Sequence, residues 1–183
     1  MADNIDQLYN QLQAMDAQSK SSLPPVDRWN PELSGVIDIV IKSNGEWLHE
    51  GSPIVRKPLV RLFSSILKKE GGDYYLVTPV EKWQIRVDSY PLFYDSLEIC
   101  SVAGQEALVL NGPSDYPVAI GRDHSLWVEQ LADGPLPVVA CRDGLNGVIS
   151  RNVYYELANR AVENDAGEIG IWSGGCWFSL EAH

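Results

Sequence analysis

The sequence predicts an α+β fold that contains a duplicated unit, one helix packed on a small antiparallel sheet in each half of the chain. A strand, an amphipathic helix and two further strands are indicated between residues 46 and 88. A looser version of the same order occupies residues 137–180. Between them lie short strand patterns separated by Gly, Pro, Asp or Asn, which are typical of antiparallel hairpins.

The composition indicates a globular chain with an acidic surface. Of 183 residues, 45% are hydrophobic and 21% are charged, and the formal net charge is -11. Because such a surface repels phosphates, we expect neither nucleic acid nor an acidic membrane as a partner. No apolar run approaches the roughly 20 residues of a membrane span, and the N-terminus lacks a signal-peptide pattern. Three scattered cysteines fit reduced thiols, so the expected location is cytoplasmic.

The chain divides into three predicted parts, residues 1–22, 23–92 and 93–183. In the first part, residues 4–15 show helical spacing of apolar side chains and predict a short helix that docks on the body or on a partner. Residues 17–25 are rich in Ser and Pro and predict a linker. The other two parts are the first α+β half and the second half.

In the first half, residues 36–42 and a strand starting at Glu46 form a predicted hairpin. Pro58 stands where a helix begins, and Lys68 and Lys69 fall in its expected last turn before Gly71-Gly72. Residues 74–79 and 83–87 predict a second hairpin. The apolar stripe of the helix consists of Leu59, Leu62, Phe63, Ile66 and Leu67.

In the second half, four short strands predict a meander at residues 97–103, 107–110, 116–120 and 126–131. Another strand is expected at residues 137–141, and then Asp143 caps a helix over residues 144–164. The last hairpin joins residues 169–172 and 176–180 through Gly174-Gly175. The duplication pairs Leu59, Leu62 and Phe63 of the first helix with Leu145, Val148 and Ile149 of the second.

No catalytic or metal-binding motif is complete. His49-Glu50 resembles the start of a zinc-protease helix, but Pro53 stands where the second histidine is required, so we expect no metal and no cofactor. Ser173-Gly174-Gly175 resembles a serine-protease segment without the preceding glycine that the oxyanion hole needs. A hairpin turn explains that segment better. A thiol nucleophile at Cys176 or Cys141 remains an alternative, beside the interpretation of Cys176 as a small buried hydrophobe.

Five basic residues are concentrated around the first helix, namely Arg56, Lys57, Arg61, Lys68 and Lys69. Arg56 and Lys57 stand at its N-terminal end, where the helix dipole favours an anion, and Arg142 holds the equivalent place in the second copy. One interpretation is that the chain has two equivalent anion sites, one at the N-terminal end of each helix. The other is a set of salt bridges with acids such as Glu81, Asp88 and Glu156.

Three segments carry a family resemblance: HEGSPIVRKPLVRLFSSIL, YYLVTPVEKWQIRV and SRNVYYELANRAV with GIWSGG. Over residues 23–180 the chain resembles the bacterial family of domain of unknown function 1285. The resemblance implies two related halves, a C-terminal half like a pleckstrin-homology barrel, and a binding site where the halves meet. It also implies a role in signalling, with no established activity.

The sequence therefore favours a non-enzymatic ligand-binding or regulatory module with a site between the two halves. The ligand would be small and anionic or polar, because unlike charges and aromatic side chains gather near both helix–hairpin junctions. The alternatives are a thiol-dependent enzyme and a protein-interaction subunit that docks through its N-terminal segment. The expected site residues are His49, Glu50, Arg56, Arg61, Glu81 and Lys82 from the first half, and Arg151, Tyr154, Trp172 and Ser173 from the second.

Overall fold

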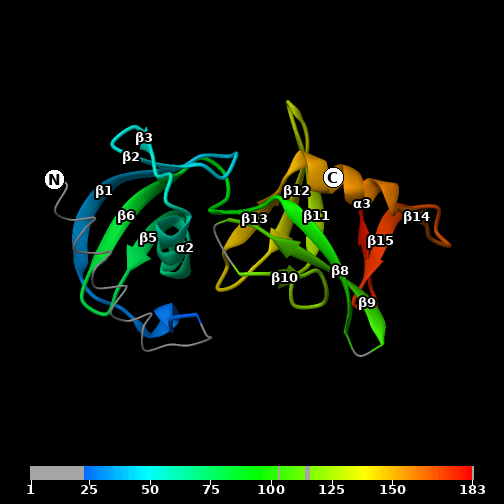
Figure 1. Ribbon diagram of the computed structural model, residues 1–183, viewed down its shortest axis with the longest axis horizontal. Helices are drawn as coiled ribbons and strands as arrows, with labels where there is room; N and C mark the ends of the chain where they lie inside the picture. Colours follow the sequence, from blue (N-terminus) through cyan, green and yellow to red (C-terminus); the bar gives the residue numbers. More distant parts are fainter. Residues whose placement is uncertain (1–22, 103, 114–115, 183) are drawn as a thin grey trace. The chain divides into compact units, whose positions relative to one another are not determined.

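The computed structural model describes residues 23–102, 104–113 and 116–182 (Figure 1). The predicted helix at residues 4–15 and most of the linker lie outside the described residues. Internal contacts divide the chain into two units. The first comprises the described residues up to Ile41 together with Glu46–Asp88, and the second comprises Lys42–Gly45 and the chain from Ser89 onward. None of the described helices has the length and apolar composition of a membrane span.

The first unit is built on a six-stranded sheet with the order β3-β2-β1-β6-β5-β4. The parallel pair β1–β6 joins two antiparallel groups of strands. The predicted hairpins correspond to the antiparallel pairs β1–β2 and β5–β6, so both are confirmed. A 3-10 turn, η1 (Val26–Arg28), precedes the sheet. The strands are β1 (Leu33–Ile41), β2 (Trp47–His49), β3 (Ser52–Pro53), β4 (Leu67–Glu70), β5 (Asp73–Val77) and β6 (Lys82–Val87).

Helix α2 (Lys57–Ser65) lies on one face of this sheet (Figure 1). Its buried side chains include Leu59, Val60 and Phe63, and the Phe63 ring packs against Trp47 with 6.3 Å between ring centroids. Each fully buried side chain of this kind contributes about 1.5–3 kcal/mol of transfer free energy. The amphipathic helix of the first half is therefore confirmed.

The C-terminal end of this helix differs from the prediction. Lys68 and Lys69 belong to β4 rather than to a last helical turn, and Gly71-Gly72 turn β4 into β5. The hydroxyls of Ser64 and Ser65 donate to backbone carbonyls three and four residues earlier, which weakens helix continuation. Pairing of β4 with β5 then outweighs the helical spacing of Ile66 and Leu67.

The second unit contains three sheets, with the strand orders β10-β9-β8, β11-β12-β13-β7 and β14-β15-β16. The predicted meander is correct for the first three of its strands, whereas β11 begins a separate sheet with β12. The strands are β7 (Leu92–Tyr94), β8 (Ser96–Val102), β9 (Gln105–Asn111), β10 (Val118–Ala119), β11 (Leu126–Leu131), β12 (Gly134–Ala140), β13 (Asn146–Ile149), β14 (Val162–Glu163), β15 (Ile169–Ser173) and β16 (Cys176–Ser179).

The second helix, α3 (Arg151–Asn159), is shorter than predicted and begins later. Val148 and Ile149 lie in β13, where they pair with β12 and β7, although their spacing also fits a helix. The N-cap is Ser150, whose Oγ accepts a hydrogen bond from the N–H of Val153 at 3.3 Å. Asp143, the predicted cap, instead has a positive φ of 51° in the loop before β13.

A parallel pair of short strands positions α3. Strand β7 runs beside β13, and the N–H of Ser150 donates to the carbonyl of Tyr94 at 2.8 Å, directly before the helix. The strands approach closely because Gly147 has no side chain: a Cβ there would lie 2.5 Å from the Tyr94 ring. A larger residue at position 147 would push the two strands apart.

The two units are alike in the elements that follow each helix, whereas the strands before the helices differ. Each nine-residue helix is followed by three antiparallel strands, β4–β6 after α2 and β14–β16 after α3. At the constant offset that matches the helices, Phe63 corresponds to Leu157 and Trp83 to Trp177. The predicted pairing of Phe63 with Ile149 was wrong, since Ile149 is in a strand. The fold is α+β with open sheets among the described residues, and the pleckstrin-homology likeness stays a prediction.

The start of α3 can be tested by substitution. Ser150→Ala removes the cap and should lower the free energy of unfolding by about 1 kcal/mol in urea titrations. Asp143→Gly should be neutral or stabilising, because glycine adopts a positive φ at no steric cost. A greater loss from Asp143→Gly than from Ser150→Ala would contradict a helix that begins at Arg151.

Candidate functional site

The expected site residues fall in both units. His49, Glu50, Arg56, Arg61, Glu81 and Lys82 lie in the first unit, and Arg151, Tyr154, Trp172 and Ser173 lie in the second. Within each unit the structure brings some of them together and separates the others. Some of them line three pockets: His49 and Arg56 line one, Trp172 lines another, and Arg151 and Tyr154 line the third.

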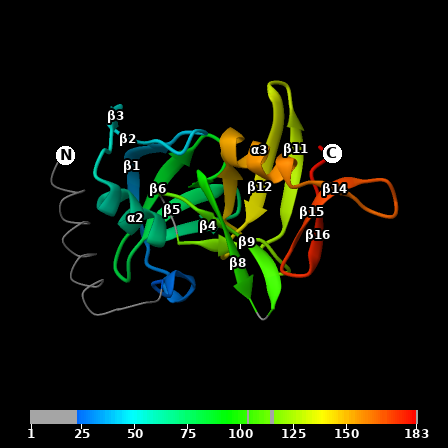
Figure 2. The ribbon, with the colours of Figure 1, turned by 45° about the vertical axis from the view of Figure 1, so that its right-hand side comes forward.

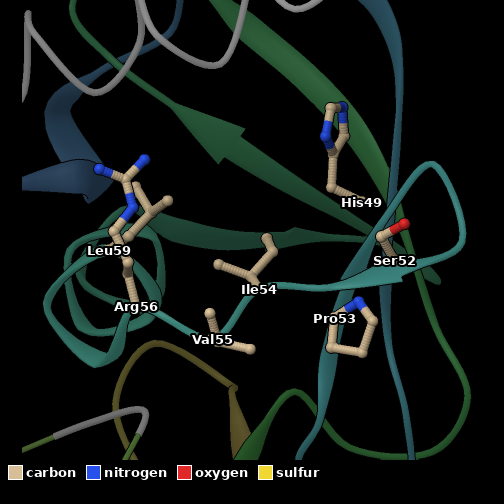
Figure 3. Close-up of a pocket in the computed structure, with 7 residues that line it drawn as sticks. All are labelled: His49, Ser52, Pro53, Ile54, Val55, Arg56 and Leu59. Carbon is tan, nitrogen blue, oxygen red and sulfur yellow. The ribbon is translucent and has the colours of Figure 1, made fainter.

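The β3–α2 pocket of the first unit brings His49 and Arg56 together. It has a volume of about 240 Å³ and is lined by His49, Ser52, Pro53, Ile54, Val55, Arg56 and Leu59. Figure 3 shows the imidazole of His49 and the guanidinium of Arg56 on either side of Ile54. Two basic side chains over an apolar base could hold a small anion.

Glu50 stands at the turn beside this pocket. Strands β2 and β3 pair His49 with Ser52, so Glu50 and Gly51 are the two central residues of a hairpin turn. Both have positive φ, 48° and 76°, as a type I′ turn requires. A glutamate is costly in this conformation, whereas asparagine or glycine is favoured. Its exposed carboxylate lies at the edge of the unit rather than in the pocket lining.

The other expected residues of the first unit lie elsewhere. Lys82 pairs with Leu33 at the start of β1, whereas His49 pairs with Ile39 farther along that strand. Strands β2 and β6 also flank β1 on opposite sides, so His49 and Lys82 are separated both along β1 and across the sheet. Glu81 precedes Lys82 in the β5–β6 turn, where its N–H donates to the Thr78 hydroxyl. Arg61 is exposed on α2 and does not line the pocket.

Lys82 is part of a charged cluster on the sheet. Its Nζ lies 2.9 Å from a Glu70 carboxylate oxygen, and Lys68 lies 3.2 Å from the other oxygen. The hydrogen bond from Lys82 is the main cause that lowers the pKa of Glu70 below its usual value. These contacts support the salt-bridge interpretation for Lys68, although its predicted acidic partners were different residues.

The N-terminal end of α2 is a weak anion site by itself. The N–H groups of Leu59 and Val60 both donate to the carbonyl of Arg56, and Pro58 has no N–H. Few backbone donors therefore remain for a ligand. In the second unit, Arg142 does not lie at the start of the helix, because the N-cap of α3 is Ser150 and its first residue is Arg151.

The α3 pocket of the second unit brings Arg151 and Tyr154 together. Its volume is about 570 Å³, within the usual range for small-molecule sites. Both ribbon views show α3 beside β12, whose prolines form part of the lining (Figure 1, Figure 2). The lining residues are Ser43, Asn44, Phe93, Pro135, Leu136, Pro137, Val148, Ile149, Ser150, Arg151, Tyr154 and Tyr155.

Charge and aromatic surface combine in the α3 pocket. Within the described part of the chain, Arg151 has no hydrogen-bond or ion-pair partner, so its charge is available to a ligand. The hydroxyl of Tyr154 donates to the carbonyl of Leu180, and burial raises the pKa of this residue. Tyr155 is 58% exposed and can pack on an apolar group.

Trp172 and Ser173 are adjacent but have different surroundings. Trp172 is 56% exposed and lines the β15 pocket, together with Glu106, Leu108, Asn159, Arg160, Val162 and Ile171. Ser173 is fully buried, where its hydroxyl donates to the carbonyl of Ile120 at 2.7 Å and accepts from the N–H of Leu108 at 2.9 Å. Ser173 therefore joins three segments of backbone.

Sequence reasoning missed most of the α3 pocket. Phe93 and the prolines at positions 135 and 137 come from strands that pair only in the folded unit. Tyr155, adjacent to the predicted Tyr154, could have been found as an aromatic residue on a polar helix face. Among the described residues, no group of three His, Cys, Asp or Glu side chains could hold a metal ion.

Two family models match the chain: the N-terminal domain of the domain of unknown function DUF1285 over residues 24–90, and its C-terminal domain over residues 91–180. No curated protein matches. A crystal structure of a DUF1285 family protein from Silicibacter pomeroyi DSS-3 is similar, with 37% identity, a TM-score of 0.80, and coverage of 93% of this chain and 94% of that one. Another, from Shewanella baltica OS155, shares 24% identity and a TM-score of 0.52, covering 68% and 92%.

Ser173→Ala tests the structural role of this hydroxyl. The change leaves the Leu108 N–H and the Ile120 carbonyl without their buried partner, so unfolding should become easier by about 1–3 kcal/mol. Urea denaturation followed by tryptophan fluorescence measures the loss. Ser125→Ala, at an exposed position of the same unit, is the control. Equal stability of the two variants would contradict the bridging role.

Glu50→Asn tests the turn conformation in the first unit. Asparagine tolerates a positive φ better than glutamate, so the variant should gain about 0.5–1 kcal/mol in free energy of unfolding. Glu32→Asn removes an exposed acid whose φ is not positive and controls for the change in charge. If both variants gain the same stability, the cause is charge rather than the turn.

Proposed function

The chain belongs to the DUF1285 family, and we propose that it is a binding module whose α3 pocket holds a small organic anion. The observation that carries the proposal is Arg151: it lines the pocket and has no partner among the described residues. A ligand carboxylate would give this guanidinium a charge-assisted hydrogen bond.

The rest of the lining indicates what the ligand carries besides its charge. Phe93, Tyr155 and the prolines of β12 offer apolar surface, while Val148 and Ile149 are buried beneath it. An aromatic or branched acyl group would bury its surface there at about 25 cal/mol per Å². The N–H groups of Arg151 and Asn152 lie in the first turn of α3 and have no acceptor within the helix, so they add favourable dipoles for the carboxylate.

A module that binds a ligand without a catalytic group acts as a sensor or carrier. This agrees with the regulatory role expected from the family resemblance. The β3–α2 pocket, with His49 and Arg56, is a candidate for a second and smaller anion, since its volume is less than half that of the α3 pocket. Thiol chemistry has less support, because Cys141 hydrogen-bonds with Tyr94 at 3.3 Å and Cys176 lines none of the three pockets.

We also propose that the two units descend from one duplicated element. The corresponding helices have the same length and N-cap position, and a meander of three strands follows each one. In this alignment Arg56 and Ser150 are the corresponding caps, and Lys57 and Arg151 are the corresponding first helical residues. Each unit therefore places a basic residue at the first position of its helix.

Isothermal titration calorimetry with 3-phenylpropionate tests the α3 pocket. Arg151→Gln should raise the Kd about tenfold or more, since a hydrogen bond to a charged group contributes about 1.5–3 kcal/mol. The amide 3-phenylpropanamide should bind the unchanged protein equally weakly, because it lacks the negative charge.

Arg122→Gln provides the matched control. Arg122 is exposed in the same unit and lies outside the α3 pocket, so its removal changes the net charge equally without touching the ligand. If Arg151→Gln and Arg122→Gln weaken binding by the same factor, the effect is long-range electrostatics. Failure of the acid to bind more tightly than the amide would contradict the proposed site.

A further inference from the structure

The β15 pocket has an apolar base beneath a polar rim. Leu108 and Ile171 are each 1% exposed, and the pocket between β9, β15 and the end of α3 has a volume of about 370 Å³. Val162 and Trp172 add exposed apolar surface at its sides. The rim carries Glu106, Asn159 and Arg160. These residues are separate from the lining of the α3 pocket.

The pocket exists because β14 is short. This strand has two residues and pairs with β15 only at Ile169 and Gly170. Within the described part of the chain, the segment between α3 and β14 does not pair with β15, so the backbone of Trp172 has no partner strand on that side. Among the described residues no strand pairs with this edge of β15 beside Trp172. A ligand in the gap would face both polar edge backbone and the indole of Trp172.

Two opposite charges lie together on the rim. An Arg160 guanidinium nitrogen is 2.8 Å from a Glu106 carboxylate oxygen, and both side chains are well exposed, at 39% and 55%. An exposed pair of this kind contributes little to stability, so a ligand can separate it at small cost. Arg160 is also the C-cap of α3, where the negative end of the helix dipole favours a cation.

We propose that the β15 pocket binds a free α-amino acid with an apolar side chain. The α-carboxylate would pair with Arg160, and the α-ammonium would pair with Glu106 near the C-terminal end of α3. One exposed ion pair is then replaced by two, and neither protein charge loses its partner. The apolar side chain would lie on Leu108 and Ile171, in a space large enough for a residue the size of leucine.

The arrangement selects for a zwitterion. A simple carboxylate could pair with Arg160 but would leave Glu106 beside the negative ligand. A simple amine could pair with Glu106 but would meet the guanidinium of Arg160. An α-amino acid carries an ammonium and a carboxylate on its α-carbon, so it can pair with both side chains while its third substituent enters the apolar base.

The test compares three probes on the full chain by ¹⁵N–¹H NMR titration: L-leucine, L-leucinamide and 4-methylpentanoate. Leucinamide lacks the carboxylate and 4-methylpentanoate lacks the ammonium, while the isobutyl group is common to all three. Leucine should bind about threefold to fivefold more tightly than either analogue, with shift changes at Trp172 and Asn159. Equal binding of the three probes, or no saturable binding of leucine, would overturn the proposal.

Substitutions of the two charged residues provide a second test of the proposal. Glu106→Gln and Arg160→Gln should each raise the Kd for leucine about threefold to fivefold, whereas Arg122→Gln should leave it unchanged. A variant that does not fold is recognised by loss of NMR dispersion, and the comparison of probes on the unchanged protein then decides. Arg151→Gln leaves the β15 pocket intact, so failure here is distinguishable from failure of the α3 pocket.

Discussion

The parallel pairing of β7 with β13 is the contact on which the second unit depends. It aligns Leu92, Phe93 and Tyr94 with Gly147, Val148 and Ile149, residues distant in the sequence. The hydrogen bond from the Ser150 N–H to the Tyr94 carbonyl continues this pairing by one residue and fixes where α3 starts. Close approach requires a glycine at position 147, since any side chain would meet the ring of Tyr94.

The α3 pocket follows from this pairing. Phe93 comes from β7, Val148 and Ile149 from β13, and Arg151, Tyr154 and Tyr155 from the helix that begins immediately afterwards. The N-cap at Ser150 holds the first turn in place and leaves Arg151 at its start. A cation beside apolar and aromatic surface is thus a consequence of strand register and helix capping together.

Much of the local structure could be predicted, whereas pairings between distant strands could not. Hairpins such as β5–β6 and β15–β16 are encoded by alternation and turn residues over short spans. The parallel pairs β1–β6 and β7–β13 bring together segments that no local pattern connects. Val148 and Ile149 fit both a helix and a strand, and only their pairing with β7 and β12 decides. Arg151 and Tyr154 are one helical turn apart, so a local pattern could predict them together. Phe93 joins them only through the pairing of β7 with β13, which no local pattern shows.

The central claim is that Arg151 and the apolar lining around it form the principal binding site. Titration of the ¹⁵N-labelled full chain with 3-phenylpropionate tests it most directly, because amide shifts report where the ligand lies. We expect saturable changes at Phe93, Ile149 and residues 150–155, with the largest shifts in the first turn of α3. Shifts confined to the β3–α2 pocket or the β15 pocket, or the absence of saturable shifts, would contradict it.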